Sequence, residues 1–196
     1  MPNFRIFTES KADIKFLIDY IGEVFNIELN EKEDFDSLLG WSGYKSNGKI
    51  KASIKENSID NEKISILILD ADNNFLQRQK EVQSDFAGFN IPISLFLFPN
   101  NNSAGTLESI LCEIATERQL IQCFEAYENC IAGHQTPVIK SKIFAYLDAL
   151  LPSVNKRNDK NDLIQDHNRN YRNKLHWNLN HEFLNPLKEF LSQHIG

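Results

Sequence analysis

The chain has 196 residues, of which 41% are hydrophobic and 24% are charged, and its formal net charge at pH 7 is −6. These values are typical of a globular protein with a real hydrophobic core, and the negative charge argues against a protein that coats nucleic acid non-specifically. A nuclease remains compatible, because metal ligands are themselves acidic. No stretch approaches the roughly 18 consecutive apolar residues of a membrane span, and residues 1–5 open no signal peptide, so we expect a cytoplasmic protein with no membrane partner.

Strands and helices are predicted to alternate along the first half of the chain. Residues 4–9 predict a strand, and an apolar stripe over 14–25 predicts a helix. The charged residues 30–36 are expected to be mobile, and 37–41 is a candidate second strand. Such alternation is typical of β-α-β units and a mainly parallel sheet. Further elements are expected at 49–61 (helix), 64–72 (a buried strand ending in carboxylates), 73–88 (helix) and 91–99 (a strand ended by Pro99).

Helical patterns dominate the second half of the chain. The helical period continues over 117–151, with an interruption, and a short amphipathic helix over 185–194 closes the chain. Residues 155–174 are very polar and dominated by Asn and Asp, so we expect a solvated or partly disordered excursion rather than a nucleic-acid-binding arm. We therefore divide the chain into an α/β core at residues 1–115 and a helical C-terminal extension at 116–196 that packs on the core.

The three cysteines are odd in number and show no Cys-x-x-Cys spacing. This pattern argues against a disulfide framework and against a zinc site. Free cysteine is often buried, so we expect Cys112, Cys123 and Cys130 to pack on helices.

Three carboxylates follow strands of the predicted sheet. Glu9 closes the first strand, and Asp70 and Asp72 close the run over 64–72. Ligands bind beyond the carboxyl ends of parallel strands, and side-chain alternation would turn Asp70 and Asp72 the same way, where they could hold a divalent metal. The alternative is structural, because Asp is common in turns and residues 72–74 could cap the next helix.

Glu9 with the residues after it, and Asp70-Ala71-Asp72, resemble the signature of the TOPRIM domain, which topoisomerases, bacterial primases, recombination mediators and OLD-family nucleases share. Two positions depart from the pattern, because Ser10 stands where Gly is usual and Thr8 where an apolar residue is usual. The chain also resembles, over essentially its whole length, a bacterial TOPRIM-like family of unknown function, in residues 68–72, 96–101, 105–108 and 186–191.

The resemblance implies a TOPRIM-like, mainly parallel four-stranded sheet flanked by helices, with a helical C-terminal extension. It implies that Glu9, Asp70 and Asp72 are catalytic and hold Mg²⁺ or Mn²⁺, with Glu9 as general acid or base or shared ligand. Glu108 is a further metal candidate, because 105–108 resembles the acidic element that follows the last core strand in these families. The alternative for Glu108 is a first-turn glutamate that favours the helix dipole.

We therefore expect a Mg²⁺-dependent phosphoryl-transfer protein that acts on nucleic acid and is nuclease-like. The alternative is a non-catalytic binding or regulatory module that keeps the fold, with or without a metal, and serves a protein partner or its own oligomer. Basic side chains around the edge that holds Glu9 and Asp70 would favour the first function, and an edge ringed by acidic residues alone would favour the second.

Overall fold

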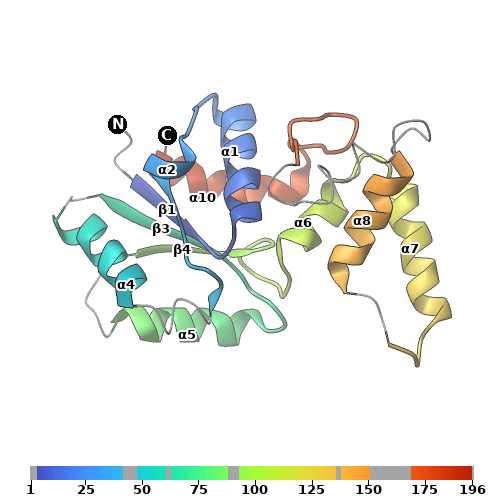
Figure 1. Ribbon diagram of the computed structural model, residues 1–196, viewed down its shortest axis with the longest axis horizontal. Coiled ribbons are helices and arrows are strands. Elements are labelled where there is room, and N and C mark those ends of the chain that lie inside the picture. Colours follow the sequence, from blue (N-terminus) through green and yellow to red (C-terminus); the bar gives the residue numbers. More distant parts are fainter. Residues whose placement is uncertain are drawn as a thin grey trace.

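A four-stranded sheet lies at the centre of the computed structural model, which describes residues 4–41, 48–60, 63–87, 93–135, 138–150 and 169–195 (Figure 1). All strand pairs are parallel, and the strand order is β2-β1-β3-β4. The expected α/β class with a four-stranded parallel sheet is confirmed. The strands are β1 (Phe4–Thr8), β2 (Phe35–Ser37), β3 (Ile64–Asp70) and β4 (Ile93–Phe98).

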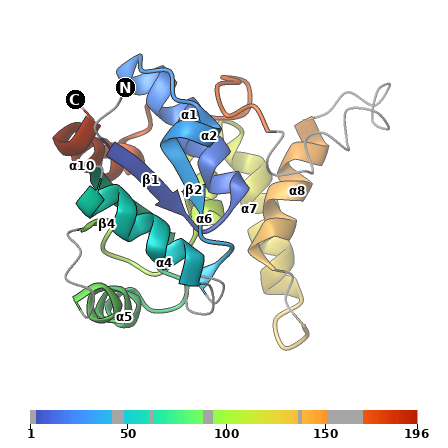
Figure 2. The same cartoon turned by 60° about the vertical axis from the view of Figure 1, so that its left-hand side comes forward.

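Helices lie on both sides of the sheet, and a pair of helices projects from one end of it (Figures 1 and 2). The structure confirms, within a few residues, the predicted strands at 4–9, 64–72 and 91–99. It also confirms the predicted helical segments at 14–25, 49–61, 73–88, 117–151 and 185–194 in their described parts. The helical segments of the described residues are α1 (Lys11–Phe25), α2 (Glu31–Asp34), α4 (Gly48–Lys55), the π-helical η1 (Glu56–Asp60), α5 (Phe75–Ala87), α6 (Leu107–Ile114), α7 (Arg118–Cys130), α8 (Ile139–Leu150), the 3-10 turn η3 (Glu182–Leu184) and α10 (Asn185–Ile195).

Two apolar clusters cover the two faces of the sheet. Ile66 and Ile68 of β3 belong to a cluster with α1, α6 and α10, whereas Leu67 and Leu69 belong to a second cluster with α4 and α5. Alternate side chains of β3 therefore face opposite layers, as the pleat of a strand requires. Burial on both faces explains why this strand reads as a nearly continuous apolar run.

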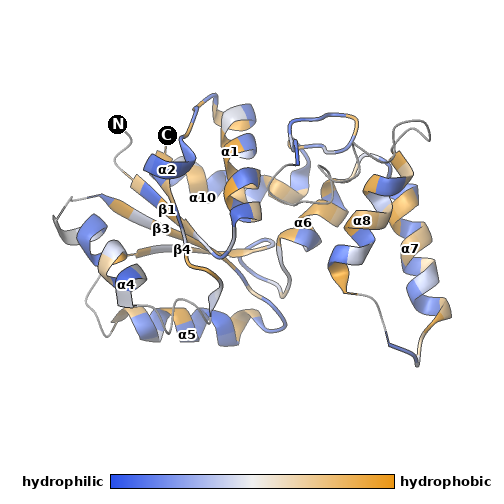
Figure 3. Ribbon diagram, in the orientation of Figure 1, coloured by the Kyte–Doolittle hydropathy of each residue, from blue (hydrophilic) through white to orange (hydrophobic). Residues whose placement is uncertain are grey.

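The first cluster also crosses the boundary at residue 115. The cluster that contains Ile6 of β1 also buries Trp177, Tyr146 of α8 and, from α10, Leu187. The α7–α8 pair lies at the right of Figure 1, and both helices mix hydrophobic and hydrophilic residues, as helices with one buried side do (Figure 3). No helix among the described residues is long and apolar enough to cross a membrane.

The second strand lies earlier than predicted. It is β2 at Phe35–Ser37 rather than 37–41, because Leu39 and Gly40 have φ angles of 57° and 80°, which no β-strand accommodates. The charged residues 30–36 were expected to be mobile, and this expectation is also wrong. They form α2 and the start of β2, with the Asn30 side chain accepting a hydrogen bond from the backbone of the new helix.

Part of the polar segment is buried rather than solvated. Residues 155–168 lie outside the described residues, but Arg169 and Tyr171 are 2% and 0% exposed. The backbone N–H of Tyr171 donates to the Asp19 carboxylate of α1 at 2.9 Å. The prediction of a solvated excursion is therefore wrong here, because tertiary contacts supply partners for polar groups that composition alone assigns to water.

The prediction that the cysteines pack on helices is confirmed for one of them. Cys112 of α6 is buried, whereas Cys123 and Cys130 are exposed on α7. The difference follows from position, because α6 lies in the main cluster and α7 buries only one side.

Candidate functional site

Glu9 and Asp70 meet at the carboxyl edge of the sheet. Strands β1 and β3 are direct neighbours, with Thr8 opposite Ile68, so both chains leave the sheet at the same level. The backbone N–H of Asp70 donates to the Glu9 carboxylate at 3.3 Å. The parallel strands thus bring together two residues that are 61 positions apart in the sequence.

The Asp70 side chain points toward the layer that contains α1 and α6. Its Oδ1 atom accepts a hydrogen bond from the backbone N–H of Leu107, the first residue of α6, at 3.1 Å. This contact places a carboxylate at the positive end of a helix, where the partial charges favour it.

Glu108 follows in the first turn of α6 and is also buried. It accepts a hydrogen bond from the Thr106 hydroxyl at 2.8 Å, and Lys140 of α8 lies 3.5 Å from its other oxygen. Glu108 therefore lies in the first turn of a helix, where the helix dipole favours a carboxylate, as the structural alternative predicts. It also lies near Asp70, as a metal ligand would.

Asp13 is a site residue that the sequence analysis missed. It is only 5% exposed and forms a capping box with Ser10 at the start of α1. The Ser10 N–H donates to Asp13 at 2.8 Å, and the Asp13 N–H donates to the Ser10 hydroxyl at 3.3 Å. Ser10 thus caps the helix. The Ser-x-x-Asp spacing predicts this helix cap. It does not predict that the Asp13 carboxylate also lies near Glu9 and Glu108.

Thr8 also stabilises this turn. It is fully buried, and its hydroxyl donates to the Ser10 carbonyl at 3.0 Å. Ser10 and Thr8 therefore both stabilise the turn that carries Glu9.

Glu9, Asp13, Asp70 and Glu108 form what we call the carboxylate cluster. Burial raises the pKa of Asp13 to about 7, and the nearby charges of Glu9 and Glu108 act in the same direction, against the hydrogen bonds from Ser10. Burial, with the charges of Asp13, Glu9 and Glu108, also raises the pKa of Asp70 well above its usual range. The cluster holds repelling charges that a proton or a cation would relieve.

Glu9 occupies the side of the cluster nearest to α5. Burial raises the pKa of Glu9, while the Arg78 guanidinium and the backbone N–H groups of Asp70 and Trp41 counteract that rise. Glu9 therefore connects the carboxylate cluster to the residues around α5.

Asp72 does not face the same way as Asp70, so this prediction is wrong. The strand ends at Asp70, and Asp72 has a φ angle of 50°, which breaks the extended alternation. Its carboxylate pairs with Arg78 of α5, on the opposite face of the sheet from α1 and α6. Its backbone forms an isolated bridge with Gly105.

Basic side chains do lie at this edge. Arg78 affects Glu9, and Lys140 pairs with Glu108, so the acidic residues are flanked by two cations. Lys11 is exposed at the start of α1, and Lys45 lies outside the described residues. The edge is therefore not ringed by acidic residues alone.

No three His, Cys, Asp or Glu side chains within the described ranges are arranged to hold a metal ion directly. The ligand atoms that the cluster offers are nevertheless all carboxylate oxygens. In each of the four carboxylates, one oxygen accepts a hydrogen bond from a backbone N–H or a hydroxyl group. Mg²⁺ binds through one or two carboxylates and keeps several of its waters, so this donor set fits Mg²⁺ without three direct ligands.

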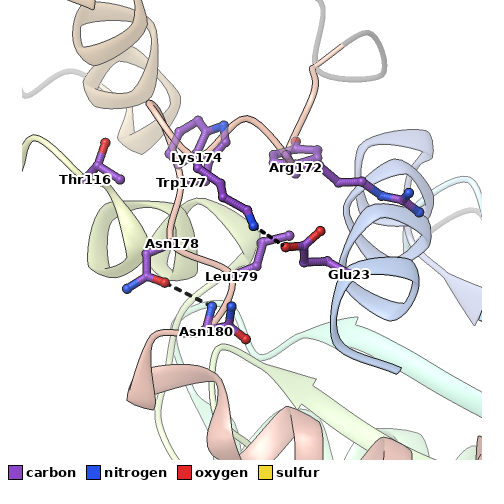
Figure 4. A pocket seen from close by; sticks show the side chains of 9 residues that line it. Glu23, Thr116, Arg172, Lys174, Trp177, Asn178, Leu179 and Asn180 are labelled. Atoms are coloured by element: carbon purple, nitrogen blue, oxygen red, sulfur yellow. Dashed lines mark hydrogen bonds and ion pairs between the residues drawn. The ribbon is translucent and has the colours of Figure 1, made fainter. Parts of the chain in front are cut away.

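A cavity of about 230 Å³ lies away from this cluster, between α1 and residues 171–180 (Figure 4). Its polar groups largely bond to one another, because Lys174 pairs with Glu23 at 2.9 Å and the Asn180 N–H donates to Asn178. No member of the carboxylate cluster lines this cavity, so it does not enlarge the candidate site.

Comparison of the chain with protein families, with curated protein sequences and with solved structures gives no match. The functional argument therefore depends on the residues of the site.

Proposed function

We propose that this chain is a TOPRIM-like protein that uses Mg²⁺ or Mn²⁺ to transfer phosphoryl groups in nucleic acid, as a nuclease does. The observation that carries the proposal is the gathering of the half-buried Asp70 with three other carboxylates, two of them buried, at the carboxyl edge of a parallel sheet. Burying like charges together is costly unless they bind protons or a cation. Open α/β sheets bind their ligands at this edge.

Asp70, Glu9 and Glu108 are the residues that would hold the cation, directly or through water. A bound divalent cation supplies positive charge to a phosphate oxygen during the transfer. Asp13 contributes negative charge but is held in the capping box, so we assign it to positioning the start of α1. We do not assign Asp72 as a metal ligand, because its carboxylate pairs with Arg78.

Two further tasks can be assigned. Glu9 is half-buried and burial raises its pKa, so it is also the candidate for taking a proton from the attacking water. Lys140 flanks the cluster from α8 with a half-exposed side chain and would attract the phosphates of a nucleic acid.

The test compares metal binding and nicking in two variants that each remove one negative charge, Asp70→Asn and Asp72→Asn. Mg²⁺ and Mn²⁺ are titrated calorimetrically into the wild type, Asp70→Asn and Asp72→Asn, and the same samples are incubated with supercoiled plasmid. We expect saturable binding and metal-dependent nicking in the wild type, loss of both in Asp70→Asn, and retention of both in Asp72→Asn. The absence of specific heat at millimolar metal in the wild type would refute the metal site.

A binding or regulatory module is the second candidate function. The observation that favours it is that Lys140 already neutralises part of the cluster, while no three ligands in the described residues are prearranged around one point. Metal binding without nicking of plasmid, single-stranded DNA or RNA would support this second function.

A further inference from the structure

A cavity of about 370 Å³ lies beside the carboxylate cluster, on the α5 side of the sheet. It is formed by the turn after β3 and the first turns of α5, together with Trp41. The backbone N–H of Trp41 bonds to Glu9, so the cavity and the cluster share a wall. The cavity's lining includes Trp41, Asp72, Asn73, Gln77, Arg78 and Glu81.

Trp41 and Arg78 provide a flat surface in this cavity. The Arg78 guanidinium lies over the Trp41 ring, 5.2 Å from its centroid. The Asp72 carboxylate pairs with the same guanidinium, and the Arg78 side chain is only 10% exposed, so its position is well defined. Nucleobases stack on aromatic rings and on arginine guanidinium planes.

Polar groups surround this surface. Asn73 and Gln77 carry amides, which both donate and accept hydrogen bonds as the edges of bases do, and Gln77 donates to Glu81 at 3.0 Å. Among the described residues that line the cavity, the charged groups are two carboxylates, Asp72 and Glu81, and one guanidinium. The net negative charge of these groups disfavours a phosphate in the cavity and tolerates a neutral base.

We infer that this cavity binds a nucleobase of a single-stranded nucleic acid, which stacks on the Trp41–Arg78 pair. The phosphate attached to that base would then lie outside the cavity, toward Glu9 and Asp70. The position of the phosphate rests on the proposed function, whereas binding of the base requires no metal.

Tryptophan fluorescence reports on this site directly. The chain has two tryptophans, Trp41 in the cavity and Trp177 in the core at 2% exposure. Trp177→Phe leaves Trp41 as the reporter, and circular dichroism checks that this variant is folded. In EDTA, an oligothymidylate of about 12 nucleotides should quench the fluorescence saturably, and a duplex of the same length should quench it much less.

Matched variants assign the binding to Arg78. Arg78→Gln should weaken binding of the labelled oligothymidylate, measured by anisotropy, by about tenfold or more, because it removes the guanidinium that lies over the Trp41 ring. Lys80→Gln removes the same charge from an exposed position of α5 and should change the affinity by less than about twofold, as expected for one screened surface charge. Equal losses in the two variants, or no quenching by the oligothymidylate or thymidine monophosphate at millimolar concentration, would overturn the inference.

Further measurements identify the source of the base and separate the two proposals. Quenching by thymidine monophosphate as strong as that by the oligomer would keep the base site but overturn the assignment to a strand. Asp70→Asn should keep the quenching in EDTA, although the proposed function predicts that it loses metal-dependent nicking. Quenching without nicking in the wild type would refute the proposed function alone, and nicking without quenching would refute the base site alone.

Discussion

Asp70 and Asp72 are separated by one residue, and yet their surroundings are opposite. Asp70 ends β3, faces α1 and α6, and is half-buried among other carboxylates, and its pKa is raised by desolvation and then by their charges. Asp72 follows a turn, has a side chain that is 49% exposed, and pairs with Arg78. The same carboxyl group is thus repelled by its neighbours on one face of the sheet and neutralised on the other. Local sequence proximity is therefore a poor guide to shared chemistry once a strand has ended.

The largest expected difference between the two aspartates is in reaction rate. Asp70→Asn should lower the rate of Mn²⁺-dependent plasmid nicking by about a hundredfold or more, because it removes a charge from the proposed cation site. Asp72→Asn should lower the rate by less than about tenfold, because its carboxylate faces α5. Time courses of nicking at saturating Mn²⁺ measure both rates. Equal losses would show that the two aspartates act together.

The pH dependence of stability should also distinguish the two faces. The pKa of Asp13 is about 7 in the fold, compared with 3.8 for the ordinary group. Between these values the folded state retains a proton that the unfolded state has lost, so the free energy of unfolding should fall as pH rises through this window. The slope should be about 1 kcal/mol per pH unit. Urea unfolding at about pH 5 and about pH 8 measures it.

Variants assign this slope to the carboxylate cluster. Asp13→Asn should reduce the slope, because it removes a group that gains a proton on folding, whereas Asp72→Asn should leave it unchanged. Millimolar Mg²⁺ should restore part of the stability at about pH 8, because the cation binds the ionised cluster and stabilises the folded state. A stability that rises with pH across the window would contradict the burial of ionisable carboxylates.

A smaller effect is expected for nucleic acid on the Asp72 side. Asp72→Asn removes one negative charge from the cavity that Arg78 and Trp41 line. The affinity for oligothymidylate should therefore rise by about two- to fivefold at low salt, and the gain should shrink as salt is added. Anisotropy titrations at two salt concentrations measure this. A loss of affinity would indicate instead that Asp72 is needed to hold Arg78 over the indole ring.

The smallest expected effect concerns the ion pair between Lys140 and Glu108. Lys140 is 51% exposed, so solvent screens its charge, and Lys140→Gln should change the free energy of unfolding by less than about 1 kcal/mol. Urea unfolding at neutral pH provides the measurement. A loss several times larger would mean that Lys140 is required to neutralise the cluster and would favour the regulatory function over cation binding.

Much of the α/β layer could be predicted from the sequence, because its signals are local. The apolar run of β3 and the helical stripe of α1 each depend on residues within one element. The meeting of Glu9 and Asp70 also followed, since parallel strands end at a common edge. The second strand was misplaced because the φ angles of Leu39 and Gly40 leave little trace in composition.

Only the tertiary structure decided which carboxylates act as a group and which do not. The sequence predicts only a capping role for Asp13, whereas in the structure α1 and α6 share one cluster and Asp13 lies near Glu108. Asp72 reads as a partner of Asp70 until a positive φ angle turns it toward Arg78. The sequence by itself determined the strands, the helices and the edge at which their polar ends meet, because hydrophobic periodicity is a property of each segment. Which side chains become neighbours depends on how separate segments pack against one another. No local sequence pattern encodes the distance between side chains of different segments.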